Sequence, residues 1–233
     1  MVKVFSVCLW GNNPIYTVGA IKNAILCAEF YPDFEYWVYV HTPSVPEDVI
    51  QTLRDMKHVK VILRTGDVTT CKPMMWRFEP IDDPTVDVML SRDVDTRILS
   101  REKLAVDEWL QSGKAFHMMR DHPYHYDPNA KIMGGMFGTK KLGISWIHEM
   151  NKVVQVSERQ YDQYFLNDVI YPIVYNNTLV HTSFTIYTFE ADSRRFPIQY
   201  GDDFRFVGEY VYADDSRPQS YIDALSACIP AGH

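Results

Sequence analysis

The sequence is poor in cysteine, and no two of its cysteines form a Cys-x-x-Cys pair. Four cysteines are present among 233 residues, and two of them, Cys8 and Cys27, lie in apolar segments. A disulfide scaffold or a zinc ribbon would need a denser and more regular spacing of cysteines. The cysteines are therefore predicted to be reduced core residues of a protein in a reducing compartment.

The sequence also lacks a long apolar run. No window approaches the roughly 20 consecutive apolar residues that cross a bilayer as a helix. The first residues, Met-Val-Lys-Val-Phe-Ser-Val, continue directly into a strand pattern and lack the apolar block of a signal peptide. We therefore expect a cytoplasmic protein with no transmembrane segment.

Positive charge is sparse and scattered. The 23 lysines and arginines are outnumbered by 30 aspartates and glutamates, which gives a net charge of -7 with no basic run. Binding to a nucleic-acid backbone needs clustered basic side chains, so nucleic acid is not an expected partner. A small anionic ligand is still compatible, because charges beyond about 10 Å are screened and local arginines or a metal decide the field.

The hydrophobic pattern alternates between strands and helices. Runs rich in β-branched and aromatic residues predict strands, and segments with helical spacing follow them. The predicted strands span 2–9, 35–41, 59–63, 86–90 and 115–119, and the predicted helices span 15–30, 46–56, 100–113, 140–154 and 160–169. Such alternation favours an α/β fold with a mainly parallel sheet flanked by helices. Ser100 is expected to cap the third helix.

Two aspartates, Asp93 and Asp95, follow the predicted strand at 86–90. Residues two apart in an extended chain project to the same side, so both can face one cation while Val94 points back into the protein. Carboxylate oxygens suit Mg²⁺ or Mn²⁺, which keep coordination positions open for substrate phosphates. The carboxyl ends of strands are also where open α/β sheets bind ligands. The pattern indicates either a metal-phosphate site or a solvated turn.

Other candidate residues lie at predicted strand ends. The loop after the first strand carries Gly11, Asn12 and Tyr16, which could hold a nucleotide base at the same edge of the sheet as the aspartates. Gly134 and Gly135 interrupt a strand-like run. Glycines in such a run indicate either the close approach of a ligand or a bulge.

Three further residues have both a functional and a structural interpretation. Arg77 could fork onto phosphate or sugar oxygens, or it could pair at the surface with Glu79 or Asp82. Asp162 lies at the start of a predicted helix, where it could simply complement the helix dipole. His181 follows an apolar pair and, taken alone, is typical of a structural histidine.

Five motifs occur in a fixed order along the chain. They are Ser91-Arg92-Asp93-Val94-Asp95-Thr96-Arg97, Arg101-Glu102, Ala105-Val106-x-Glu108-Trp109-Leu110, Met119-Arg120-Asp121-His122-Pro123 and Gly134-Gly135-Met136-Phe137-Gly138. Together they resemble GT-A type glycosyltransferases of bacteria and large DNA viruses, including the glycosyltransferase domain of chloroviruses. The likeness covers roughly residues 3–210 and is more specific than one Asp-x-Asp triplet. It implies a single GT-A (Rossmann-like) domain over 1–233, with a nucleotide-binding half up to about 97 and a sugar and acceptor half after it.

The resemblance also implies an activity. It is the metal-dependent transfer of a hexosyl or deoxyhexosyl group from a nucleotide sugar, UDP-linked by family likeness, to a glycan or another hydroxyl acceptor. The implied cofactor is Mn²⁺ or Mg²⁺, bound by Asp93 and Asp95 with His181 as the third ligand. If the protein is viral, the expected location is the host cytoplasm.

The resemblance finally implies roles for individual residues. The nucleotide would be bound by Trp10, Gly11, Asn12, Tyr16, Arg77 and Asp93, and the sugar by Arg77, Asp121, His122, Gly134, Gly135 and Asp162. Asp162 and Gln163 resemble an Asp-Gln pair beside the reacting carbon of retaining enzymes, so retention is favoured. An inverting enzyme would instead need a carboxylate base, Asp121 or Asp162. The alternatives are a binding module without turnover and a nucleotide-sugar pyrophosphatase.

Overall fold

The computed structural model describes residues 1–70, 72–127, 130–153, 161–190 and 192–229. Its strands are β1 (Val2–Leu9), β2 (Phe34–His41), β3 (Val59–Arg64), β4 (Val86–Arg92), β5 (Phe116–Arg120), β6 (Met136–Lys140), β7 (Thr178–Thr182) and β8 (Ser193–Arg194). Its α-helices are α1 (Pro14–Phe30), α2 (Glu47–Arg54), α3 (Lys72–Met75), α4 (Ser100–Gln111), α5 (Trp146–Val153), α6 (Tyr161–Tyr164), α7 (Tyr171–Val174) and α8 (Gln219–Ser226). Shorter 3₁₀ and π segments are η1 (Trp76–Asp82), η2 (Pro123–His125), η3 (Phe165–Ile170) and η4 (Tyr175–Asn177).

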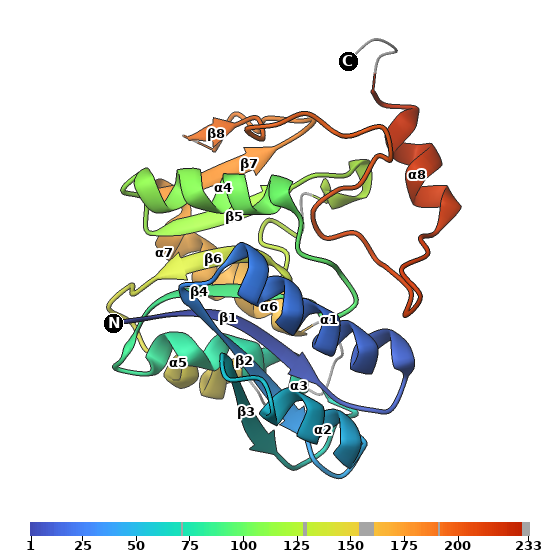
Figure 1. Cartoon of the computed structure of the whole chain (residues 1–233). Helices are drawn as coiled ribbons and strands as arrows, with labels where there is room; N and C mark the ends of the chain where they lie inside the picture. Colours follow the sequence, from blue (N-terminus) through green and yellow to red (C-terminus); the bar gives the residue numbers. More distant parts are fainter. Residues whose placement is uncertain (71, 128–129, 154–160, 191, 230–233) are drawn as a thin grey trace.

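One sheet of eight strands runs through the described chain in the order β3-β2-β1-β4-β6-β5-β7-β8 (Figure 1). β6 is antiparallel to both of its neighbours, and every other pair is parallel. The predicted α/β fold, with a mainly parallel sheet flanked by helices, is confirmed. Because β1 and β4 are parallel neighbours, the loops that follow them emerge side by side at one edge of the sheet.

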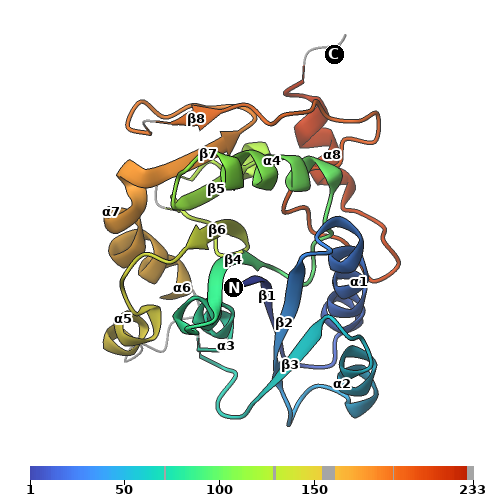
Figure 2. The same ribbon diagram turned by 60° about the vertical axis from the view of Figure 1, so that its left-hand side comes forward.

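Alternation along the strands divides the core between the two faces of the sheet. Phe5 and Val7 of β1 pack in a cluster with side chains of α1, α2 and α4. Val4 packs on the opposite face in a cluster with side chains of α3, α5 and α7. Figure 2 shows these two helical layers on either side of the sheet. The buried pattern on both faces fixes the strand register, since a slip of one residue would exchange the two sets of side chains.

The five predicted strands are present within two residues at each end. Three predictions about helices were wrong in detail. Leu99, not Ser100, is the N-cap of α4. The helix predicted from 140 begins at Trp146, because β6 extends to Lys140. The segment predicted as one helix over 160–169 instead passes from α6 into the π-helical segment η3, which continues into α7. Residue 154, where one predicted helix ends, and residue 160, where the next begins, lie outside the described part of the chain.

The sequence did not predict α8, which lies near the end of the described chain. Within the described residues, no helix has both the length and the apolar character needed to cross a membrane. The prediction of reduced core cysteines is confirmed for Cys8 and Cys27, which are buried free thiols. It is wrong for Cys228, which is free but exposed, and Cys71 lies outside the described residues.

Candidate functional site

Asp93 and Asp95 follow β4 directly, at the edge of the sheet where the sequence places them. Val94, between them, is buried against α1. Asn23 of α1 donates to two carbonyl oxygens of this turn, at 3.3 and 2.8 Å. Gly19, one turn earlier, lies so close that a Cβ would overlap the Val94 carbonyl oxygen. α1 therefore fixes the backbone that carries both carboxylates.

Arg77 in η1 lies between two carboxylates. It is 5% exposed and pairs with Asp93 and, at 3.5 Å from Nη2 to Oδ2, with Asp162. Burial opposes its charge, but the two carboxylates hold the pKa of Arg77 above its usual value. The alternative surface pair does not form, because Glu79 pairs with Arg64 instead. Arg77 is therefore a fixed positive charge inside the site.

Gly134 and Gly135 bring the turn before β6 against these charged groups. A Cβ on Gly135 would overlap the Asp93 carboxylate. A Cβ on Gly134 would lie 2.5 Å from Arg77 Nη2 and 3.2 Å from Asp162 Oδ2. Close approach therefore explains both glycines, and the approaching groups are side chains of the site itself.

Gln163 completes this wall of the site. With its amide nitrogen turned toward Ile132, it donates to the Ile132 carbonyl oxygen at 3.0 Å and accepts from the Gly134 amide at 3.2 Å. Asp162, next to it on α6, is 4% exposed. The predicted Asp-Gln pair and the predicted glycine pair are thus brought together from opposite ends of a 30-residue stretch.

Negative charge exceeds positive charge in the site. Burial and the neighbouring Asp93 carboxylate raise the pKa of Asp95 to about 6. Burial also raises the pKa of Asp162, although Arg77 partly offsets it. Burial, which disfavours the charged form, is the largest cause of both shifts. A cation beside Asp95 would favour its ionised form.

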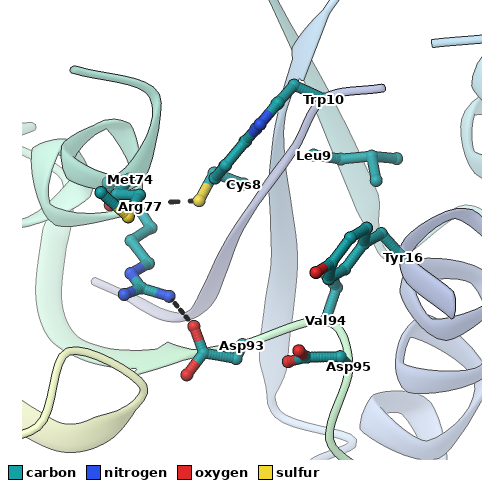
Figure 3. A pocket seen from close by; sticks show the side chains of 9 residues that line it. All are labelled: Cys8, Leu9, Trp10, Tyr16, Met74, Arg77, Asp93, Val94 and Asp95. Carbon is teal, nitrogen blue, oxygen red and sulfur yellow. Dashed lines mark hydrogen bonds and ion pairs between the residues drawn. The ribbon is translucent and has the colours of Figure 1, made fainter. Parts of the chain in front are cut away.

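Two adjoining cavities open around Arg77 and Asp93. The first, of about 360 Å³, is lined by Cys8, Leu9, Trp10, Tyr16, Met74, Arg77, Asp93, Val94 and Asp95 (Figure 3). The second, of about 350 Å³, is lined by Met74, Arg77, Asp93, Ala130, Met133, Gly134, Gly135, Met136, Asp162, Gln163 and Gly208. Each falls in the range of roughly 300–1,000 Å³ that is usual for small-molecule sites.

The residues predicted to hold a nucleotide base are only partly in place. Trp10 and Tyr16 line the first cavity, on the side away from Arg77 (Figure 3). Gly11 and Asn12 do not line it: Gly11 turns the chain at φ +77° and donates its amide to Ser44 Oγ at 2.8 Å, and Asn12 is exposed. We therefore assign these two a loop-forming role in place of the predicted binding role.

Cys8 lines the first cavity but was not predicted to do so. Burial raises the pKa of the Cys8 thiol to about 12, with nearby carboxylates adding to the effect. A thiol that stays protonated at neutral pH is a poor nucleophile and a poor metal ligand. Cys8 is therefore part of the cavity wall.

Asp121 is fully buried at the end of β5 and lines neither cavity. Its carboxylate accepts from Arg101 at 2.8 and 2.9 Å, from the Tyr200 hydroxyl at 2.8 Å and from the Val207 amide at 2.9 Å. A carboxylate has about four acceptor positions, and these four hydrogen bonds leave Asp121 none for an acceptor hydroxyl. We assign Asp121 a structural role in place of the predicted catalytic and sugar-binding roles.

His122 is also structural. It is 1% exposed, and its ring stacks on Phe206 at 4.3 Å between centroids. Nδ1 accepts from the Tyr124 amide at 3.1 Å, and Nε2 donates to the Tyr221 carbonyl oxygen at 3.0 Å. With both ring nitrogens used, His122 connects the turn after β5 to α8 and does not reach the predicted sugar site.

The structure does not bring His181, the predicted third metal ligand, to the aspartates. His181 lies in β7, three strands away from β4. At about 4.8 Å between neighbouring strands this separation is roughly 14 Å, far beyond a metal-ligand bond of about 2.1 Å. Its ring nitrogens lie 2.8 Å from His117 Nε2 and 3.2 Å from Glu108 Oε2. The prediction for His181 is corrected accordingly.

Two residues of α1 that support the site, Gly19 and Asn23, were missed. A glycine in the middle of a helix costs roughly 1 kcal/mol relative to alanine, so Gly19 was a signal of close packing that the sequence did offer.

A segment late in the chain was missed as well. The Val211 amide donates to the Asp95 carbonyl oxygen at 2.8 Å. No local pattern in the sequence marks that contact.

The donor set fits a hard divalent cation that completes its shell with a ligand. Asp93 and Asp95 supply carboxylate oxygens at the mouth of the first cavity. Across the described ranges, no group of three or more histidines, cysteines or acidic residues could hold a metal ion. Mg²⁺ is commonly held by one or two carboxylates, with waters and substrate phosphates in the other positions. The pair is therefore suited to a shared metal site and not to an all-protein one.

No protein-family model and no curated protein sequence matches this chain. Solved structures match it in fold. The structure of S. aureus TarS (1-349) gives a TM-score of 0.52 at 12% identity, over 77% of this chain and 58% of that chain. A protein assigned as a glucose-1-phosphate thymidylyltransferase from Bacillus anthracis, in complex with a sucrose, gives a TM-score of 0.50 at 11% identity, over 78% and 87%.

A glycosyltransferase involved in the glycosylation of the major capsid of PBCV-1 gives a TM-score of 0.48 at 14% identity, over 79% of this chain and 82% of that chain. At such identities the likenesses show the fold alone. The likenesses to TarS and to the thymidylyltransferase, with TM-scores of 0.52 and 0.50, support an α/β fold of the GT-A type.

Proposed function

We propose that this chain is a metal-dependent glycosyltransferase that moves a sugar from a UDP-linked donor to a hydroxyl group of a glycan acceptor. One observation carries the proposal: two cavities of similar size meet at Arg77 and Asp93, with Asp95 beside the junction. The site thus has three parts, a cavity, a charged junction and a second cavity. A nucleotide sugar also has three parts in a row, a nucleoside, a charged diphosphate and a sugar. The fold class is compatible with this activity.

In the proposed complex the nucleoside occupies the first cavity. The aromatic faces of Trp10 and Tyr16 are suited to a nucleobase. The diphosphate lies at the junction near Asp93 and Asp95, and Mn²⁺ or Mg²⁺ held there would stabilise negative charge on the departing nucleoside diphosphate. Arg77 is already paired with two carboxylates, so its part is to hold them in position.

The sugar occupies the second cavity, against Gly134, Gly135 and the Asp162-Gln163 pair. We propose that transfer occurs with retention of configuration. The Asp121 carboxylate accepts from four groups, which are Arg101, Ser183, Tyr200 and Val207. Asp162 is paired with Arg77, so neither carboxylate is placed as a free base for inversion. The Gln163 amide instead gives the sugar cavity a neutral polar wall.

The test is product analysis with a panel of UDP-sugars and Mn²⁺. Slow release of UDP and free sugar, or transfer to an added glycan, is expected from the unmodified protein. Asp95→Asn should abolish release and Mn²⁺-dependent UDP binding while leaving the fold intact. Asp168→Asn, a change at an exposed aspartate in η3, is the matched control and should behave as the unmodified protein.

Other products would contradict the proposal. UMP and sugar phosphate would identify a nucleotide-sugar pyrophosphatase. Saturable binding of a nucleotide sugar without any release would identify a binding module. Full activity after the metal is removed with EDTA would show that Asp93 and Asp95 have another task.

A further inference from the structure

Several tyrosines around the site remain accessible to solvent in the folded chain. Tyr16, Tyr124 and Tyr212 are 38, 64 and 40% exposed, and Tyr210 and Tyr221 are partly exposed. These five residues are called the tyrosine surface below. Exposed aromatic groups that lie together, and not singly, mark an interaction site.

The tyrosine surface is continuous with the first cavity. Tyr16 lines that cavity, facing Asp95 across it (Figure 3). The Val211 amide donates to the Asp95 carbonyl oxygen at 2.8 Å, which holds Tyr210 beside the same turn. Tyr210 packs edge to face with Tyr212 at 5.2 Å between ring centroids, and Phe206, four residues before Tyr210, packs against Tyr221 at 6.4 Å. Tyr210 therefore links the cavity mouth to the tyrosines of the second half of the chain.

The distant end of the surface is rigidly held. Tyr124 and Tyr221 pack edge to face with their centroids 5.9 Å apart. His122 lies beneath both, accepting from the Tyr124 amide and donating to the Tyr221 carbonyl oxygen. It is stacked in turn on Phe206. Rings that are ordered before a ligand arrives lose little conformational entropy on binding.

We infer that the acceptor is a neutral oligosaccharide whose successive rings lie along the tyrosine surface, an inference that rests on the proposed function. A sugar ring has a face of C–H groups and a rim of hydroxyls. Tyrosine matches both, with an apolar face and a polar edge. The chain's net charge of -7 and the carboxylates at the cavity mouth disfavour an acidic polysaccharide. The reacting sugar lies by Asp95, and the remaining units extend toward Tyr124.

The test measures glycan binding without nucleotide or metal. The probes are neutral tetrasaccharides of glucose, galactose, mannose, xylose and N-acetylglucosamine, each compared with its monosaccharide by calorimetry or saturation-transfer NMR. At least one tetrasaccharide should bind saturably and at least tenfold more tightly than its monosaccharide. Tyr124→Ala should weaken that binding by about tenfold, while Tyr124→Phe should retain most of it, because stacking dominates the contact.

Tyr175→Ala is the matched control, since Tyr175 is 45% exposed in η4 and packs only near Tyr171 among the ring contacts described for it. It should leave tetrasaccharide binding unchanged. The inference is overturned if no tetrasaccharide binds, if Tyr124→Ala and Tyr175→Ala have the same effect, or if a Ser/Thr-rich peptide binds in place of the glycans. Glycan binding without UDP release would instead contradict the proposed function alone, and UDP release without glycan binding would contradict this inference alone.

Discussion

Arg77 is enclosed by the two carboxylates that it neutralises, and this arrangement limits what each residue of the site can do. The guanidinium holds Asp93 at the junction of the cavities and Asp162 at the sugar side. Among the residues that the structure describes, no basic side chain forms an ion pair with Asp95, and its pKa is raised to about 6 by burial and by Asp93. The unmet negative charge at Asp95 is the feature that a bound cation would satisfy.

Gly135→Ala tests the close packing around Asp93. The added Cβ would overlap the Asp93 carboxylate and force it to turn away from Arg77. Mn²⁺-dependent UDP binding should fall more than tenfold in calorimetry, with a stability loss of about 1–3 kcal/mol from overpacking. Gly201→Ala is the control, because that glycine is exposed and has a single neighbour within 4 Å, Asp203 Oδ1 at 3.2 Å. Unchanged UDP binding in Gly135→Ala would show that the carboxylate position is not critical.

Arg77→Met tests whether the buried charges act as one unit. Asp162 would be left as a buried carboxylate without its partner, which should lower the free energy of unfolding in urea by about 3 kcal/mol. Adding Asp162→Asn removes that unpaired charge, so the double variant should be more stable than Arg77→Met alone. If the two changes instead add their separate losses, the residues are energetically independent.

At the scale of elements, α1 supports the turn that follows β4. Its Gly19 permits contact with the turn backbone, and its Asn23 donates two hydrogen bonds to it. From the other side, the segment that contains Val211 binds the same turn through Asp95. The carboxylates are thus positioned by a helix near the start of the chain and a loop near its end.

Asn23→Ala should separate the support of the site from the site itself. Loss of two buried hydrogen bonds should cost about 1–2 kcal/mol of stability. UDP affinity in the presence of Mn²⁺ should fall by about tenfold, because ligand-binding groups must be held within about 0.5 Å of their productive positions. Asn151→Ala, at an exposed asparagine in α5, should change neither quantity. If Asn23→Ala loses stability but keeps its UDP affinity, the turn is positioned without α1.

The elements could be predicted where the sequence repeats a local pattern. β1, β2 and β3 have β-branched and aromatic or aliphatic runs, and β4 and β5 have apolar stretches, so their positions follow from the sequence alone. α8 could not be predicted, because a short amphipathic helix after a long irregular stretch has little local signal. The cap of α4 was misassigned for a related reason: Ser100 is a good capping residue by type, but the chain turns into the helix one residue earlier, at Leu99.

At the scale of the whole molecule, the sheet order explains which site residues could be predicted. Asp93 and Gly134 were identified from motifs, and Arg77 and Asp162 from the family resemblance. The neighbouring strands β4 and β6 bring the first two together, and η1 and α6 add the other two to the same cavity. The wrong site predictions have two causes. Asp121 is already fully hydrogen-bonded, and His181 lies too far from the aspartates. Asp121 has the right residue type, but donors from distant segments occupy it, and no motif reveals that.

Buried histidines give the whole molecule a dependence on pH. Burial is the largest cause that lowers the pKa of His117, His122, His125 and His181, so all four favour the neutral form. The raised pKa of Asp95 acts in the opposite sense, because the folded state then binds a proton more readily than the unfolded state. The free energy of unfolding therefore contains contributions that fall and contributions that rise as the pH is lowered. The contribution of one histidine is measured by substituting that residue alone.

His125→Asn isolates one such contribution. Burial, with the charges of His122 and Arg120, lowers the pKa of His125 to about 3, and its Nδ1 accepts the Asp121 amide at 3.1 Å. Because the folded state resists protonation, the stabilisation is complete above the unfolded pKa of about 6.5 and is lost as the pH falls toward 3. Between pH 7 and pH 5 the unmodified protein should therefore lose about 2 kcal/mol more unfolding free energy than His125→Asn, in which the amide oxygen replaces the acceptor. Urea unfolding at both pH values measures this difference, and equal losses in the two proteins would show that His125 is protonated in the folded state.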